Sequence, residues 1–307
     1  MKLFRTITLM LVLLTAVPIA VVGFILIDSS VDTLKTLTWE LQQERADHAG
    51  RAAAGFFENI ISDLDLLLAN FSLANMNLRQ RQELLSFILQ KRPEVNIIAF
   101  YDNHGRSLHN LLAFDSRRIL PSELTDHQSK VQKIDFSKKS DLPVAFSAPY
   151  RIQRKARPKF SIEARNETVV AMAIRLNAGD TAFLGMEISL NSLQAIIERI
   201  RVGQQGEVML ISSSGFLIAR KSGIGQKIVS DKLPGRLALI LVPSVDEKEP
   251  VPMVSGVRPI KVGEDQQILA AYAPLANPAW LMISTEPLDQ AYAATRKMTW
   301  QVITVVL

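Results

Sequence analysis

Residues 206–220, GEVMLISSSGFLIAR, decide the fold of this chain. An apolar run leads into a short polar turn that ends in glycine, and a second apolar run returns. Residues 97–111, IIAFYDNHGRSLHNL, repeat the same order around an Asp-Asn-His-Gly turn. Two copies of one strand–turn–strand unit predict two similar antiparallel sheets in tandem.

Each hairpin is followed by segments that complete its sheet. These segments are rich in β-branched and aromatic residues and are bounded by turn residues such as Gly179-Asp180. Together with the helices described next, they predict an α+β fold with two tandem antiparallel-sheet modules. We expect strands at 144–151, 168–176 and 182–189 in the first sheet, and at 256–262, 267–274 and 280–286 in the second.

A long helix is predicted before the first hairpin. Residues 28–74 contain no proline, and their apolar side chains recur at helical spacing. One continuous signalling helix of this length would extend about 70 Å at 1.5 Å per residue. Two shorter helices, broken near Gly50 or Gly55, are the alternative. Shorter helices are predicted at 79–92, 190–200 and 288–297.

The apolar positions of the long helix form two groups. Leu34 and Leu41 lie one heptad apart on a narrow stripe, so we expect them to face the same helix of a second copy in a homodimer. The other group recurs at i, i+3 and i+4 and is expected to pack on the sheets. It comprises Phe56, Phe57, Ile60 and Leu64.

Two charge-free stretches lie at the ends of the chain. Residues 6–27 carry no ionisable side chain, and about 20 helical residues are enough to cross a bilayer. We therefore predict a first transmembrane helix at 6–27, with the start of a second, truncated one at 298–307. A cleaved signal peptide is the alternative, but the apolar run is too long and no small-x-small site follows it.

The charges beside the first stretch predict its orientation. Lys2 and Arg5 precede it, whereas Asp28 and Asp32 follow it. Because basic residues stay on the cytoplasmic side, residues 1–5 are expected in the cytoplasm. Residues 28–297 are then extracytoplasmic, at the inner (plasma) membrane, and periplasmic in a cell with two membranes. The lipid bilayer is thus a predicted partner.

Composition excludes several classes of protein. The formal net charge of +5 is too small to indicate a nucleic-acid partner. The chain has no cysteine, which rules out disulfides and thiol chemistry. Residues 151–159, RIQRKARPK, carry five cations, and we interpret them as a solvated loop rather than as a patch for an anionic ligand.

Catalytic signatures are missing as well. The sequence contains no G-x-S-x-G, no H-E-x-x-H and no glycine-rich phosphate loop. No enzymatic activity within this chain and no cofactor are therefore predicted. Asp102, His104, His109 and Asp115 lie within fourteen residues, but their spacing matches no standard zinc site, so no metal is predicted either.

Three segments resemble the double Cache sensor domains of bacterial transmembrane receptors, and the resemblance implies that the two tandem antiparallel-sheet modules are PAS-like. The first is the long helix with the hairpin at 95–108, and the second is residues 206–220. The third is residues 270–293, AAYAPLANPAWLMISTEPLDQAYA, which is similar to that family's closing strands. The likeness covers about residues 28–297.

This resemblance implies a sensory role. A membrane-distal module at 75–190 would hold a small molecule, a membrane-proximal module at 191–287 would relay the signal, and the exit helix would occupy 288–297. Such domains precede histidine kinases, chemoreceptors, diguanylate cyclases or phosphatases. We expect the helices at 28–74 and 288–307 to move relative to one another when ligand binds. A membrane-anchored structural or adhesion module and an extracytoplasmic hydrolase are the alternative functions.

One departure from the family concerns the ligand. Amino-acid-binding members carry an R-x-W-Y signature in the distal module, whereas tryptophan occurs here only at positions 39, 280 and 300. The family's clamp on an amine and a carboxylate is therefore not carried over. Organic acids, amines, sugars and nucleobases remain open as ligand classes.

Four residues are predicted to bind the ligand. The pocket is expected between the strands at 97–101 and 144–150 and the loop at 114–139. Arginine offers a planar fork for carboxylate or phosphate, and tyrosine offers an apolar face with a hydroxyl. The predicted residues are Tyr101, Arg117, Arg118 and Tyr150.

Overall fold

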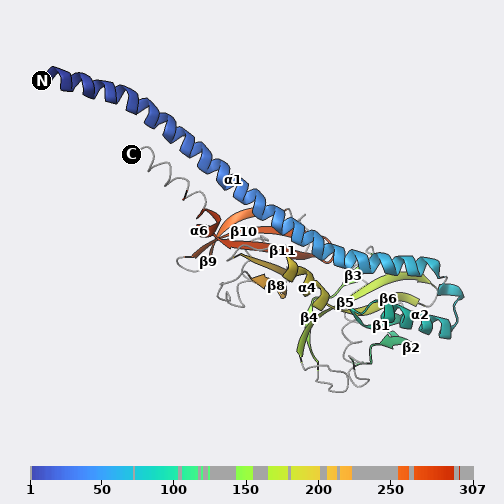
Figure 1. Cartoon of the computed structure of the whole chain (residues 1–307). Coiled ribbons are helices and arrows are strands. Elements are labelled where there is room, and N and C mark those ends of the chain that lie inside the picture. Colours follow the sequence, from blue (N-terminus) through green and yellow to red (C-terminus); the bar gives the residue numbers. More distant parts are fainter. Residues whose placement is uncertain are drawn as a thin grey trace, which may run out of the picture.

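Figure 1 shows one long helix that runs along two successive antiparallel sheets. The structure is a computed structural model. It describes residues 2–71, 73–102, 106–116, 119, 124, 143–154, 165–178, 181–200, 206–212, 215–222, 255–262, 266–293 and 297. Among these residues, no helix qualifies by length and hydropathy as a candidate membrane span. The predicted second span at 298–307 lies outside the described residues.

Helix α1, Lys2–Asn70, is continuous. The alternative of two shorter helices is therefore wrong. Gly50 does not break the helix. Its missing side chain lets α1 lie close to the sheet residue Ala273, because a Cβ added at Gly50 would lie 3.4 Å from the Cβ of Ala273. The helix ends at Asn70, short of the predicted residue 74, and the Asn70 side-chain amide donates to the carbonyl of Leu66 at 2.8 Å.

Two short helices follow α1 before the first strand. The 3₁₀ helix η1 spans Leu73–Asn75, and α2 spans Leu78–Lys91. Asn77 and Gln80 form a reciprocal capping box at the start of α2, with both hydrogen bonds at 2.9 Å. The helix predicted at 79–92 is thus confirmed to within one residue.

The first sheet has the strand order β2-β1-β6-β5-β3, and β4 also pairs with β5. The segment predicted as one strand at 144–151 is two strands, because Ser147–Pro149 interrupt it and proline lacks the N–H that a ladder needs. The strands are β1 Val95–Tyr101, β2 Ser107–Phe114, β3 Val144–Phe146, β4 Tyr150–Arg154, β5 Arg165–Ala178 and β6 Thr181–Ser189.

Helix α4, Asn191–Arg199, connects the first sheet to the second. The second sheet has the order β8-β7-β11-β10-β9, which repeats the path of the first sheet. All the strands predicted here are confirmed, and α6, Leu288–Ala291, follows the last of them. The strands are β7 Glu207–Ser212, β8 Leu217–Ser222, β9 Gly256–Val262, β10 Gln266–Leu275 and β11 Trp280–Pro287.

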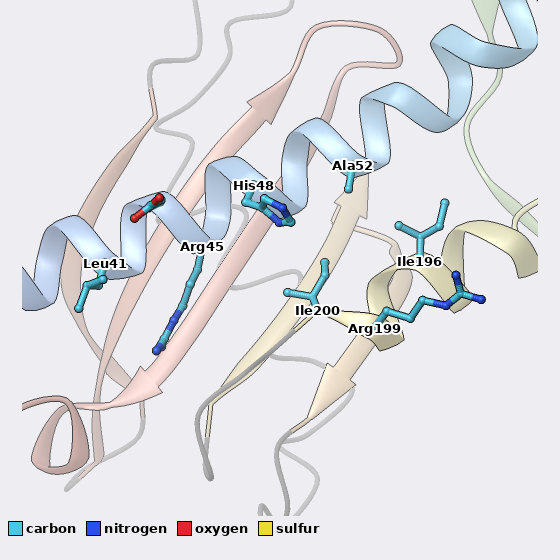
Figure 2. A pocket seen from close by; sticks show the side chains of 8 residues that line it. Leu41, Arg45, His48, Ala52, Ile196, Arg199 and Ile200 are labelled. Carbon is cyan, nitrogen blue, oxygen red and sulfur yellow. The ribbon is translucent and has the colours of Figure 1, made fainter.

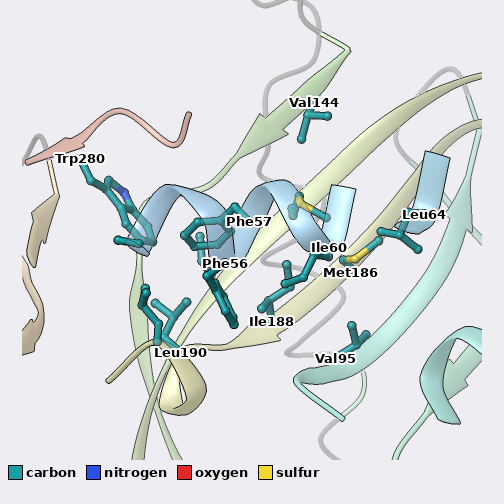
Figure 3. Packing of buried hydrophobic residues seen from close by; sticks show 14 of the residues in the cluster. Phe56, Phe57, Ile60, Leu64, Val95, Val144, Met186, Ile188, Leu190 and Trp280 are labelled. Carbon is teal, nitrogen blue, oxygen red and sulfur yellow. The ribbon is translucent and has the colours of Figure 1, made fainter. Parts of the chain in front are cut away.

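The main core lies between α1 and one face of each sheet. Opposite β10, the helix presents the fully buried Ala46, Ala49 and Ala53, whose small side chains let helix and sheet approach closely. Against the first sheet it presents larger side chains, and Figure 3 shows them next to Met186 and Ile188 of β6. The predicted packing residues Phe56, Phe57, Ile60 and Leu64 are all buried there, as expected.

Candidate functional site

The first sheet has a second buried face, which points away from α1. Side chains alternate along a strand, so Ile98 and Phe100 of β1 join the core under α1, whereas Ala99 and Tyr101 lie on the opposite face. This opposite face forms its own buried cluster. The cluster comprises Ala99, Tyr101, Ala145, Ala171, Ala173, Ala182 and Phe183, with Leu112 and Tyr150 packed beside it.

A row of very small residues crosses the middle of this face. Ala99 of β1 pairs with Gly185 of β6, Gly185 pairs with Ala173 of β5, and Ala173 pairs with Ala145 of β3. Cross-strand partners lie side by side on one face. No side chain in the row extends beyond a methyl group, so the row forms a low floor that four neighbouring strands build.

The equivalent face of the second sheet is filled. There, Met209 of β7 pairs with Ile283 of β11, which pairs with Tyr272 of β10. Met209 and Ile283 belong to a buried cluster of large aliphatic side chains. Because the two sheets share one strand path, the small floor is a property of the first sheet among the described residues.

A buried carboxylate lies one row along from the floor. Glu187 of β6 is 0% exposed and pairs with Ala171 of β5. The Tyr150 hydroxyl donates to its Oε2 at 2.7 Å, and the Asn96 side-chain amide donates to its Oε1 at 3.0 Å. Burying a carboxylate costs much free energy unless hydrogen bonds compensate, so this constellation is a candidate binding site.

Two further groups give the site its polarity. The Asn96 side-chain oxygen is buried and has no hydrogen-bond partner among the described residues. Burial raises the pKa of the Tyr101 hydroxyl above its ordinary value, and the negative charge of Glu187 raises it further. Like an ordinary tyrosine, Tyr101 keeps its proton at neutral pH, and these two effects strengthen that preference. The Glu187 carboxylate and the Asn96 oxygen are acceptors, which suits a ligand that carries N–H or ammonium donors.

The predicted ligand-binding residues fall into two groups. Tyr101 and Tyr150 lie on the same buried face of the first sheet, next to Glu187. Arg117 and Arg118 lie outside the described residues. The sequence interpretation missed Glu187 and Asn96. The available signal was the acidic residue inside the otherwise apolar or uncharged strand AFLGMEIS, residues 182–189.

A separate groove lies between α1 and α4 (Figure 2). Its volume is about 560 Å³. Its lining contains both apolar and charged side chains and includes the predicted dimer residue Leu41, but none of the residues around Glu187. The lining residues are Leu41, Glu44, Arg45, His48, Ala52, Ile196, Arg199 and Ile200.

Comparison with known proteins finds similarity at the level of structure. No family model matches the sequence, and no curated protein sequence matches it. The sensory domain of the Campylobacter jejuni chemoreceptor Tlp3 (CcmL), solved with isoleucine bound, has a TM-score of 0.54 at 14% identity. That similarity covers 85% of this chain and 97% of the Tlp3 chain.

Two further solved structures are similar over almost their whole length. The ligand-binding domain of Pseudomonas aeruginosa PAO1 chemoreceptor PctB, in complex with L-Gln, has a TM-score of 0.53 at 15% identity and covers 87% and 98% of the two chains. The extracellular domain of the putative histidine kinase mmHK1S-Z2 has a TM-score of 0.54 at 13% identity. That similarity covers 83% of this chain and 99% of the mmHK1S-Z2 chain. The fold of this chain is therefore that of the double Cache sensory domains.

Proposed function

We propose that this chain is the ligand-sensing region of a bacterial signal-transduction receptor. The observation that carries the proposal is the buried Glu187, held by Tyr150 and Asn96 beside a floor of alanine and glycine. The first module, formed by α2 and β1–β6, binds the small molecule, and the second module, formed by β7–β11, relays the signal. The similar structures reported above are sensory domains rather than enzymes, which supports a non-catalytic role.

The ligand that fits this site carries an amine or another strong hydrogen-bond donor. Glu187 and the Asn96 oxygen supply acceptors, and the two tyrosines supply flat apolar surfaces. Charge-assisted hydrogen bonds to a carboxylate are about twice as strong as neutral ones. The Tlp3 and PctB structures contain isoleucine and L-Gln, so amino acids are the first compounds to test. Arg117 and Arg118 remain predictions for a ligand carboxylate or phosphate.

A thermal-shift screen of the full chain against amino acids and small amines tests this function. A true ligand at 100 times its dissociation constant stabilises the protein by about 2.7 kcal/mol. Glu187→Gln keeps the size of the side chain but removes its charge, so it should weaken a hit by roughly 10-fold to 100-fold.

The matched control is Glu83→Gln on the exposed surface of α2, which should bind the hit as the unchanged protein does. The proposal fails if the library gives no shift, or if every hit binds equally well to the Glu187→Gln variant.

We further propose that the chain is anchored in the inner membrane and forms a parallel homodimer through α1. The charge-free residues 6–27, preceded by Lys2 and Arg5, support an anchor with residues 28–297 outside the cytoplasm. Leu41 is 55% exposed and lines the groove of Figure 2. A second copy leaving the same membrane would bring an identical helix alongside, and leucine at heptad spacing suits that pairing.

Single-cysteine variants at Leu41, and at Leu34 and Leu37 on the same stretch of α1, test both parts of this proposal. Leu41→Cys introduces the only cysteine of the chain, so labelling and cross-linking report on a single position. In intact cells, a maleimide that cannot cross the membrane should label it from outside, and oxidation should join two protomers. Ala46→Cys, fully buried on the same helix, is the control and should do neither. Labelling only after cell lysis would contradict the orientation, and no cross-link at positions 34, 37 or 41 would contradict the dimer.

A further inference from the structure

Four aromatic rings meet where the two modules join. The ring of Phe57 on α1 packs edge-to-face against Phe146 of β3, with centroids 5.2 Å apart, and against Trp280 of β11, also at 5.2 Å. Phe56 packs on the same ring at 5.0 Å. Phe57 is fully buried, and Figure 3 shows it next to Trp280. One side chain of α1 therefore contacts both sheets at once.

Strand β3 connects this junction to the candidate ligand site. It is only three residues long and pairs with β5. Ala145 lies on the floor beside Ala173, whereas the next residue, Phe146, points to the opposite face and contacts Phe57. Because neighbouring side chains of a strand point to opposite faces, a ligand that pushes on Ala145 also moves Phe146.

Strand β11 connects the same junction to the end of the described chain. It starts at Trp280, lies between β7 and β10, and leads directly into α6. Rigid secondary-structure elements are among the structures that carry energetic coupling between distant sites, and β11 is hydrogen-bonded to a strand on each side. A displacement of Trp280 therefore reaches Glu286 and Leu288, which lie at the end of β11 and the start of α6.

The far end of β11 is tied to α1. The Ser284 hydroxyl donates to the Gln42 side-chain oxygen at 3.1 Å, and the Glu286 carboxylate accepts from the Gln42 amide and from Arg45. One residue past α6, the Tyr292 hydroxyl accepts from the Trp39 indole at 2.7 Å. These bonds connect α1 to the end of β11 and to the segment after α6. The relative movement that we expect between the helices at 28–74 and 288–307 would have to break or rearrange them.

We propose that Phe57 is the mechanical relay between the modules. A displacement of β3 at the ligand site passes from Phe146 through the Phe57 ring to Trp280, and then along β11 to the exit segment. Close-packed cores respond to such a push by switching between discrete arrangements rather than by deforming continuously. The relay serves signalling only if the proposed sensory function is correct. The ring contacts that form it are present without a ligand.

Fluorine NMR of the full chain labelled with 5-fluorotryptophan in detergent or nanodiscs tests the relay without a ligand. The three tryptophans give three resonances, and Trp280→Phe assigns the one at the junction. Ala145→Val adds bulk on the floor of β3 and should shift the Trp280 resonance by more than its linewidth. The matched control is Ala182→Val, the same change in the same buried cluster but near the start of β6 and not on β3, and it should leave that resonance in place.

The decisive comparison is the pair Ala145→Val with Phe146→Leu. Leucine keeps a buried apolar side chain but removes the ring contact, so the Trp280 shift should disappear, while the Trp39 resonance confirms that α1 stays folded against the exit segment. If Phe146→Leu does not fold, Phe57→Leu carries the same expectation. A shift that survives the loss of the ring, or an equal shift from Ala182→Val, overturns the relay. Because no ligand is used, this result is independent of the thermal-shift screen.

Discussion

Replacing Phe57 with alanine is expected to lower the free energy of unfolding by about 3–5 kcal/mol. The side chain is fully buried and makes three edge-to-face ring contacts, with Phe56, Phe146 and Trp280. Each such pair contributes about 0.5–1.5 kcal/mol beyond the burial of area. The cavity left behind opens between two sheets and a helix, so no single element can move to fill it.

Urea denaturation of the full chain measures this loss. Leu66→Ala is the control, because Leu66 belongs to the same helix but is 61% exposed, and its replacement should change stability by no more than about 0.5 kcal/mol. A loss below about 1 kcal/mol for Phe57→Ala would mean that the junction is not packed around this ring.

The second large effect is expected at Glu207, where β7 begins. Its side chain is 1% exposed and pairs with the Arg220 guanidinium of β8, which is 16% exposed. Removing one partner of a buried ion pair leaves the other charge without compensation and typically costs 3–5 kcal/mol. Glu207→Ala should therefore destabilise the second sheet by about that amount.

A double replacement separates the charge effect from packing. Glu207→Met combined with Arg220→Met removes both charges at similar volume and should recover most of the lost stability in the same urea titration. Helix α4 stays hydrogen-bonded to β8 in that variant, because these bonds involve only the backbone of residue 220. The Gln194 side-chain amide donates to the Arg220 carbonyl at 2.9 Å, and its oxygen accepts from the Arg220 N–H at 3.0 Å. The exposed pair Arg79–Glu83 is the control, and Glu83→Ala should have little effect. An equally large loss there would refute the role given to burial.

Most of the fold was predictable because it depends on local patterns. The hairpin of β1 and β2, the strands of the second sheet and α2 follow alternation, turn residues and helical spacing, which are visible within short windows. The division of 144–151 into two strands was also visible, because Pro149 lies inside that segment. The end of α1 at Asn70 was harder to predict, because apolar residues continue at helical spacing beyond it.

The candidate site was predictable only in part, because it depends on register between distant strands. The positions of Tyr101 and Tyr150 at the ends of the two strands expected to border the pocket were enough to nominate them. The small floor, in contrast, exists only because Ala99, Gly185 and Ala173 become neighbours across three strands. Nothing in the one-dimensional order of residues aligns those positions. Glu187 was missed for the same reason, since an acid in a strand is usually solvated unless the sheet face it occupies is known to be covered.

The position of α1 has a consequence for how the chain is synthesised. The helix reaches the second sheet before it reaches the first, so its middle part packs on the strands that are made last (Figure 1). Gln42 and its partner Ser284 are 242 residues apart. Protein synthesis adds 5–20 residues per second, so roughly 10–50 s pass between the synthesis of Ala46, Ala49 and Ala53 and the synthesis of the strands that cover them. Only in the last part of that interval, after Ser189 has been made, does the first module have all its strands, while this part of the helix still lacks the sheet that covers it.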